Sequence, residues 1–262
     1  MELLLKTFIE TTSFTGAIIL VGLILGYLRT QTIQNFQRSF GWKAIMITAV
    51  VGVPIHELSH TIFSLIFGHR INKIKLIQRP DENGTLGYVQ HSYNPLSIYQ
   101  QVGNFFIGVA PIFGGITALI IFMRQLVPTA YTKLIDILTK NLSINTLDTD
   151  VIRNITTSYW EFIKTFFSLS NLGNIYFILF LFLAICISSH ISLSTADIKG
   201  AFKGLVIMYI FLLIVNALIG YNYILDISLL KYNIILIGFL IVSLIFSLIT
   251  YLISLILLIF KI

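Results

Sequence analysis

The sequence predicts an all-α membrane protein with about six transmembrane helices and one small β-hairpin. Of the 262 residues, 56% are hydrophobic and only 11% are charged, and the mean hydropathy is +0.91. The apolar residues form long runs rather than short alternations. Because a soluble domain of this length needs far more charge on its surface, lipid is the expected solvent for most of the chain.

Six apolar runs approach the roughly 20 residues that a helix needs to cross the hydrocarbon core. They cover residues 12–28, 44–68, 102–123, 175–194, 205–218 and 234–260. Glu2 and Glu10 flank the first run and no small-residue cleavage site follows it, so we expect it to be retained as a spanning helix. The fifth run is short and the sixth is long, which bilayer thinning and helix tilt can accommodate.

Two connections carry structure of their own. Residues 73–78 and 85–90 flank an Asn-Gly pair that favours a tight turn, so we expect a β-hairpin in which Lys73 opens the first strand and Gln90 closes the second. Residues 131–142 and 151–169 are amphipathic, and the second of these helices is expected to lie along the membrane surface. No internal repeat or low-complexity linker interrupts the chain. We therefore expect a single domain over residues 1–262, with its core at 44–203.

The basic residues fit a lipid environment. The net charge is +6, and the Lys and Arg residues lie in short stretches between apolar runs, where they can contact anionic headgroups. No basic-aromatic patch indicates nucleic acid. The expected location is the cell membrane, as a multi-pass protein. With the long 124–173 connection set aside, the positive-inside rule favours cytoplasmic termini and a cytoplasmic hairpin.

The strongest functional signal is His56-Glu57-Leu58-Ser59-His60. Residues four apart on a helix share a face, so both imidazoles can reach one metal ion. Glu57 would lie beside that ion and take a proton from its bound water, whose pKa zinc lowers to about 7. A charged side chain inside a spanning helix costs about 2.5–3.5 kcal/mol. Two His and one Glu in one span therefore favour a zinc site over a chance match.

A catalytic zinc usually has three protein ligands and one water. The single cysteine, Cys186, excludes a Cys cluster and an internal disulfide. Asp197, at the end of the fourth run, is the preferred third ligand. His190 lies seven residues earlier and would share a face with Asp197 if the helix continued. His190 thus remains open as an alternative ligand, as a donor to the tetrahedral intermediate, or as a packed polar residue.

These residues resemble the site-2 protease family of intramembrane zinc metalloproteases. That family places HExxH on one spanning helix and an aspartate on a later one, usually within Asn-x-x-Pro-x-x-x-Leu-Asp-Gly. Residues 56–60 fit the first element fully, and Asp197 fits the second loosely, because Ser189 stands at the Asn position with His190 beside it. The Gly-Pro-rich stretch at 108–114 resembles the helix between the two elements, where small residues allow close packing.

The resemblance, which covers about residues 52–200, implies a function. His56, His60 and Asp197 would hold Zn²⁺, Glu57 would activate a water, and Ser189 or His190 would support the oxyanion or the metal. The substrate would be a membrane-embedded protein segment or a hydrophobic peptide. A strand edge of the hairpin could capture the unwound substrate by β-addition.

Two other functions remain open. One is a protease acting on surface or misfolded membrane proteins, which would carry a sizeable soluble domain. The other is a metal or proton transporter that uses intramembrane His and Asp residues. Against a transporter, only the second and fourth runs hold ionisable side chains and no inverted repeat is visible.

Overall fold

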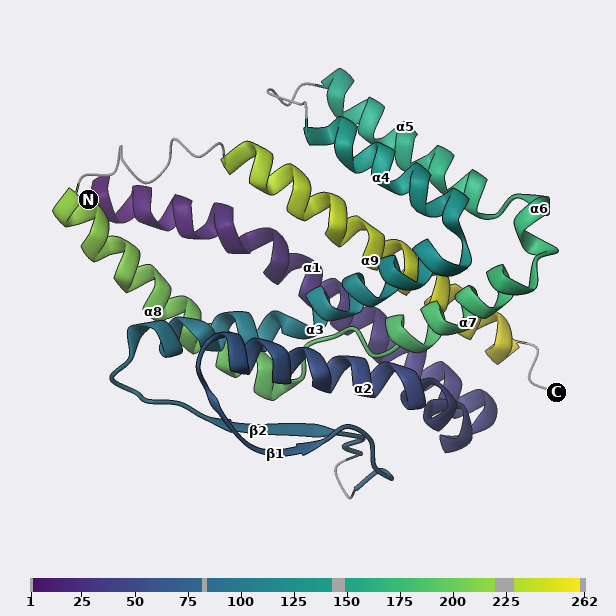
Figure 1. Cartoon of the computed structure of the whole chain (residues 1–262), viewed down its shortest axis with the longest axis horizontal. Coiled ribbons are helices and arrows are strands. Elements are labelled where there is room, and N and C mark those ends of the chain that lie inside the picture. Colours follow the sequence, from purple (N-terminus) through teal and green to yellow (C-terminus); the bar gives the residue numbers. More distant parts are fainter. Residues whose placement is uncertain (1, 82–83, 143–148, 220–228, 260–262) are drawn as a thin grey trace.

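A computed structural model of the chain describes residues 2–81, 84–142, 149–219 and 229–259. Within these ranges the fold is a bundle of helices with one two-stranded hairpin along its side (Figure 1). The helices are α1 (Glu2–Phe40), α2 (Trp42–Ile66), α3 (Ile98–Leu126), α4 (Pro128–Leu142), α5 (Thr149–Phe166), α6 (Leu169–Leu172), α7 (Ile175–Ser188), α8 (Thr195–Ile219) and α9 (Leu229–Ile259). The strands are β1 (Arg70–Lys75) and β2 (Tyr88–Ser92).

Five of the described helices, α1, α2, α3, α8 and α9, are long and apolar enough to cross a membrane. The prediction of a helical membrane protein with a small hairpin is therefore confirmed. Helix α7 is apolar but has 14 residues, or about 21 Å, which is less than the roughly 30 Å of the hydrocarbon core. Helix α1 has 39 residues, far more than the predicted 12–28, because it is extended at both ends, from Glu2 to Phe40.

The predicted fourth span, 175–194, is wrong in extent, because the helix ends at Ser188. Two serine contacts explain the break. The Ser189 hydroxyl donates to the carbonyls of Ile185 and Cys186 at 2.6 and 3.2 Å, so the side chain competes with the backbone of the last turn. Ser194 then accepts a hydrogen bond from the backbone N–H of Asp197 at 3.1 Å and starts α8.

The hairpin forms where the sequence predicts it, but its strands are displaced. Arg70 lies opposite Ser92 and Lys75 opposite Tyr88, so the ladder lies nearer to the helix ends than predicted. Beyond the paired strands, individual hydrogen bonds hold the loop. In one of them, the backbone N–H of Gln78 donates to the carbonyl of Leu86 at 2.7 Å. Gly84 has a φ of 74°, as expected for the predicted turn, whereas Glu82 and Asn83 lie outside the described residues.

An aromatic cluster joins the later helices into the core. Phe166 of α5 lies 4.9 Å from Phe177 of α7 and 5.4 Å from Phe246 of α9, measured between ring centroids. Tyr159 of α5 is also buried and donates to the carbonyl of Gly238 in α9 at 3.1 Å. The two amphipathic helices predicted from the sequence are thus present as α4 and α5, and the apolar face of α5 packs against protein. Its location at a membrane surface stays a prediction.

Helix α3 lies between α2 and α8, and small residues allow the close contacts. A Cβ at Gly108 would lie 2.5 Å from the carbonyl oxygen of Asp197, and one at Gly204 of α8 would overlap the backbone of Phe105. On the α2 side, a Cβ at Gly114 would overlap the Ser59 side chain. The predicted close packing of the 108–114 stretch is confirmed. It brings the HExxH helix and the start of α8 to the same place.

Candidate functional site

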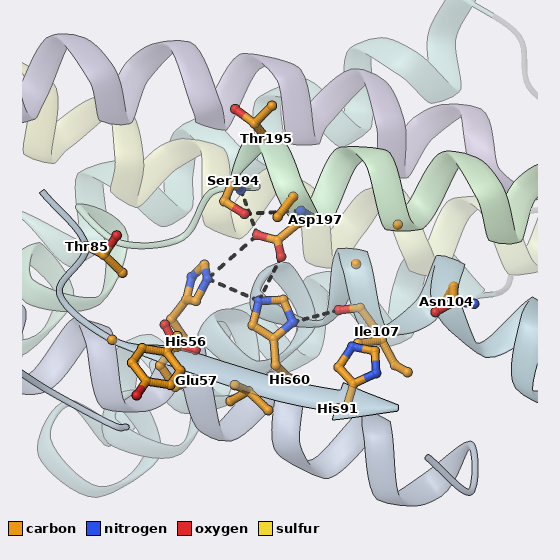
Figure 2. Close-up of a pocket in the computed structure, with 16 residues that line it drawn as sticks. His56, Glu57, His60, Thr85, His91, Asn104, Ile107, Ser194, Thr195 and Asp197 are labelled. Atoms are coloured by element: carbon orange, nitrogen blue, oxygen red, sulfur yellow. Dashed lines mark hydrogen bonds and ion pairs between the residues drawn. The ribbon is translucent and has the colours of Figure 1, made fainter. Parts of the chain in front are cut away.

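The two histidines of α2 face each other across one helical turn. The Nε2 atoms of His56 and His60 are 3.2 Å apart, and their rings meet edge to face with centroids 4.9 Å apart. Figure 2 shows both rings turned towards Asp197, which comes from α8. The spacing of four residues therefore produces the shared face that the motif predicts.

Backbone carbonyls fix the orientation of both rings. Nδ1 of His56 lies 3.0 Å from the His190 carbonyl oxygen, and Nδ1 of His60 lies 2.9 Å from that of Ile107. Since a carbonyl can only accept, each Nδ1 carries a hydrogen, and in the neutral form of each ring Nε2 is the atom with the lone pair. This second contact on the far side of the ring is typical of histidines that bind metals.

Asp197 reaches the same point from the first turn of α8. Its Oδ1 lies 3.2 Å from Nε2 of His60, and its Oδ2 lies 3.9 Å from Nε2 of His56. The carboxylate also accepts the backbone N–H of Ser194 at 2.7 Å, so Ser194 and Asp197 cap the helix reciprocally. Asp197 thus begins α8 and does not end the fourth span, contrary to the sequence prediction.

The three side chains can hold one metal ion. One ligand atom from each of His56, His60 and Asp197 lies within 4.8 Å of the other two. All three side chains line one cavity, so one side of the group is open. Among the described residues, no other group of three or more possible ligand side chains comes this close together.

Glu57 stands next to the triad and has no partner of its own. Its side chain is buried, yet it lines the cavity beside His56 and His60. Neither a hydrogen bond nor an ion pair joins its carboxylate to any residue that the structure describes. Gly87 of the hairpin packs over it, because a Cβ at Gly87 would lie 3.0 Å from Cγ of Glu57. The carboxylate is therefore available to a water in the cavity.

The main cavity has a volume of about 660 Å³, within the usual range for ligand sites. Its walls come from α2, the hairpin, α3 and the start of α8. The hairpin, suspected from the sequence to bind substrate, contributes Thr85, Gly87, Tyr88, Val89 and His91. The other walls are formed by His56, Glu57, His60, Asn104, Ile107, Gly108, Ser194, Thr195, Ala196, Asp197 and Gly200.

The two suspected supporting residues have other contacts. Thr48 donates its hydroxyl hydrogen to Ile45, so it accepts from Nε2 of His190 at 3.2 Å. His190 contributes its carbonyl to His56, but its ring is outside the ligand triad. Ser189 is buried and donates to backbone carbonyls. The expected shared helix face of His190 and Asp197 is wrong, because the chain breaks between them.

Arg29 of α1 is a site residue that the sequence does not reveal. It lines a second cavity of about 260 Å³ together with His56, Glu57 and His190. In the sequence, an arginine directly after an apolar run is typical of the basic flank of a span, and the predicted span ends at residue 28. Because α1 continues to Phe40, Arg29 lies within it, and the statement that only the second and fourth runs hold ionisable groups is wrong.

A hydrogen bond between a second pair of histidines connects the hairpin to the residues that follow α2. His69 donates from Nε2 to the Gln100 carbonyl at 2.8 Å, so its Nδ1 accepts from Nδ1 of His91 at 2.9 Å. Tyr93 stacks on the His69 ring with centroids 5.0 Å apart. Burial, followed by the nearby His69, lowers the pKa of His91 to about 4, and burial also lowers the pKa of His69. The lowered pKa values favour the neutral form of both rings.

No family model, curated protein or solved structure matches this chain. The chemistry of the site thus rests on its own geometry. Two oriented imidazoles, one capped carboxylate and one unpaired glutamate meet on the wall of a cavity between apolar helices.

Proposed function

We propose that this protein is an intramembrane zinc endopeptidase that hydrolyses peptide bonds in membrane-embedded segments or hydrophobic peptides. One observation carries the proposal. Asp197, distant in sequence, lies with His56 and His60 at one point, and the unpaired Glu57 stands beside them.

The donor set supports zinc as the metal. Zn–N and Zn–O bonds of about 2.0–2.2 Å at tetrahedral angles separate neighbouring ligand atoms by roughly 3.3 Å. The two Nε2 atoms are 3.2 Å apart, and the nearest carboxylate oxygens of Asp197 are Oδ1 at 3.2 Å from His60 and Oδ2 at 3.9 Å from His56. One ligand atom from each residue lies within 4.8 Å of the other two, so small movements bring them to this spacing. Three protein ligands with an open fourth position are typical of catalytic zinc rather than of structural zinc.

The residues of the chain would divide the remaining work. Bound zinc supplies a Lewis acid and lowers the pKa of a coordinated water to about 7. Glu57 accepts the proton of the attacking water and delivers it to the leaving amine nitrogen. The carbonyls of His190 and Ile107 keep both imidazoles aligned, and Ser194 keeps Asp197 in place.

The hairpin gives the substrate a route to the site. Peptide bonds in a membrane helix are hydrogen-bonded internally, so a segment must unwind before it is cut. Strand β2 and the residues before it form one wall of the main cavity, beside Glu57. An unwound segment pairing with this strand would recover its backbone hydrogen bonds while its scissile bond faces the triad.

A metal or proton transporter is the second candidate. The observation that favours it is the presence of ionisable side chains in α1 as well as in α2 and α8, including Glu10, which accepts from Asn216 of α8 at 2.7 Å. Either function can use the metal ligands and a carboxylate beside them, but only a peptidase needs Glu57 as the general base for cleavage of a peptide bond. The role of Glu57 therefore separates the two functions.

The deciding experiment compares Glu57→Gln with the wild type in proteoliposomes loaded with a fluorogenic, mainly apolar peptide. We expect the variant to bind zinc at the wild-type stoichiometry and to lose cleavage by about 10²–10⁴-fold, the usual contribution of a general base. Glu161→Gln is the matched control, because Glu161 is an exposed residue of α5 outside the site. Undiminished cleavage by zinc-loaded Glu57→Gln would rule out the mechanism. Zinc flux without cleavage by the wild type would favour the transporter.

A further inference from the structure

Arg29 is a charged group inside a spanning helix, and among the described residues it has no hydrogen-bond or ion-pair partner. Its Nε is sealed from solvent without a hydrogen bond, and neither a hydrogen bond nor an ion pair joins the guanidinium to any residue that the structure describes. Arginine stays protonated in proteins, and a buried charge left uncompensated is strongly destabilising. A partner for Arg29 is therefore expected from outside the described chain.

The carboxylates nearby already have other roles. Arg29 lies close enough to Asp197 for an electrostatic interaction, but that carboxylate contacts His60 and the Ser194 N–H. Glu57, which lines the same cavity, is the general base in the proposed mechanism. Pairing either one with Arg29 would remove a metal ligand or the base.

The cavity at Arg29 opens beside the reacting centre. It shares five wall residues with the main cavity: His56, Glu57, Thr85, Gly87 and Ser194. A group bound at Arg29 is therefore separated from the triad by little more than the His56 and Glu57 side chains. One peptide can occupy both cavities at once, with its scissile bond at the triad and one end or side chain at Arg29.

We propose that Arg29 forms an anion subsite that binds a carboxylate of the peptide substrate and thereby selects which bond is cut. The planar guanidinium offers a carboxylate two parallel hydrogen bonds, which a lysine cannot reproduce. The carboxylate is either the free C-terminus of a short hydrophobic peptide or an acidic side chain near the cleaved bond. The inference rests on the proposed peptidase function and names the substrate feature that its site selects.

The test uses pairs of apolar fluorogenic peptides. The first pair has one sequence with either a free C-terminal carboxylate or a C-terminal amide. The second set is amidated throughout and carries Glu or Gln at single positions on the C-terminal side of the cleaved bond. The readout is the ratio of kcat/KM for the anionic peptide to kcat/KM for its neutral twin. The pair that gives the high ratio identifies the source of the carboxylate.

For the wild type we expect a ratio of about 10–100 in one of the sets, the usual gain from a hydrogen bond to a charged group. In Arg29→Gln the ratio should fall to about one, and Arg29→Lys should lie between the two. Arg153→Gln is the matched control, because Arg153 is exposed on α5, and it should keep the wild-type ratio. Zinc content and thermal unfolding establish that each variant is folded, and Arg29→Lys carries the test if Arg29→Gln is not.

A wild-type ratio near one in both sets, or a ratio that survives in Arg29→Gln, overturns the subsite. The second result would mean that a group other than Arg29 recognises the carboxylate. Binding of the same labelled peptides to Glu57→Gln protein separates this failure from that of the peptidase. Arg29-dependent preference for the anionic peptide in binding, with no cleavage by any form, would leave the subsite standing and refute the peptidase. Cleavage without preference would do the reverse.

Discussion

At the scale of single residues, Asp197 combines two roles that usually belong to different side chains. It completes the ligand triad with His56 and His60, and it caps α8 together with Ser194. The cap holds the carboxylate still in the absence of any metal, so little side-chain freedom is lost when an ion binds. Under the proposed function, metal binding and helix α8 would therefore stabilise each other.

These two roles can be separated by substitution. Asp197→Asn keeps a side-chain oxygen for the cap but removes the anionic ligand, so we expect zinc affinity to fall by more than about 100-fold, beyond the usual cost of losing a supporting contact. Ser194→Ala keeps all three ligands and should lower zinc affinity by about 10–100-fold at most. Competition with a chelator measures both. Equal affinities in the wild type and Asp197→Asn would remove Asp197 from the ligand set.

The sequence predicts the ligands better than it predicts their surroundings. His56, Glu57 and His60 follow from spacing alone, and Asp197 follows from the need for a third ligand. The cap of α8 by Ser194 and Asp197 emerges only from the structure, because the sequence analysis extended the fourth span as a continuous helix to residue 194. Arg29 could not be placed, because its role depends on α1 lying beside residues that are far away in the chain.

At the scale of elements, the hairpin is attached to the bundle at both ends. At the base of the ladder, Nδ1 of His91 donates a hydrogen bond to Nδ1 of His69. Beyond the other end of the ladder, Gly87 packs against Val53 and Glu57. The Asn-Gly pair predicts that a hairpin exists. The strand limits could not be predicted, since they depend on which residues reach α2. The hairpin should therefore respond to changes in these contacts without unfolding of the helices.

The histidine pair makes the hairpin sensitive to acid. In the folded protein the pKa values of His69 and His91 both lie below the ordinary 6.5, that of His91 at about 4. When the hairpin opens and its histidines are exposed to water, these rings therefore bind more protons than in the folded protein. Its stability is full above pH 6.5 and is lost as the pH falls towards 4. Protection factors from hydrogen exchange should show β1 and β2 amides opening at pH 5 compared with pH 7.5 in zinc-loaded protein.

The control for this pH effect is His91→Gln, whose amide can still donate to Nδ1 of His69 but does not titrate. The change in strand protection between the two pH values should be smaller in this variant than in the wild type. The same pH dependence in both proteins would show that the histidine pair does not hold the hairpin.

At the scale of the whole molecule, α3 sets the distance between the two halves of the site. Gly108 and Gly204 let α3 and α8 touch at the backbone, next to Asp197, while Gly114 makes room for the Ser59 side chain of α2. The Gly-Pro-rich pattern in the sequence predicts close packing, but not its partners. Metal affinity should thus depend on helix packing far from the ligands, since Asp197 moves with α8.

Gly204→Ala tests this dependence. Gly204 lies two turns after Asp197 on the same face of α8, and a Cβ there would overlap the backbone of Phe105. We expect α8 to shift away from α3, the free energy of unfolding to fall by about 1–3 kcal/mol, and zinc affinity to fall as Asp197 leaves the two imidazoles. Thermal unfolding of the apo-protein and chelator competition measure the two effects.

The matched control is Gly26→Ala in α1, where an added Cβ meets nothing within 4 Å. That variant should bind zinc like the wild type and be slightly more stable, because alanine favours a helix over glycine by about 1 kcal/mol. If Gly204→Ala loses stability but binds zinc normally, packing and ligand geometry are independent. If it loses neither, α3 and α8 can separate without cost and the glycine contacts do not set the position of Asp197.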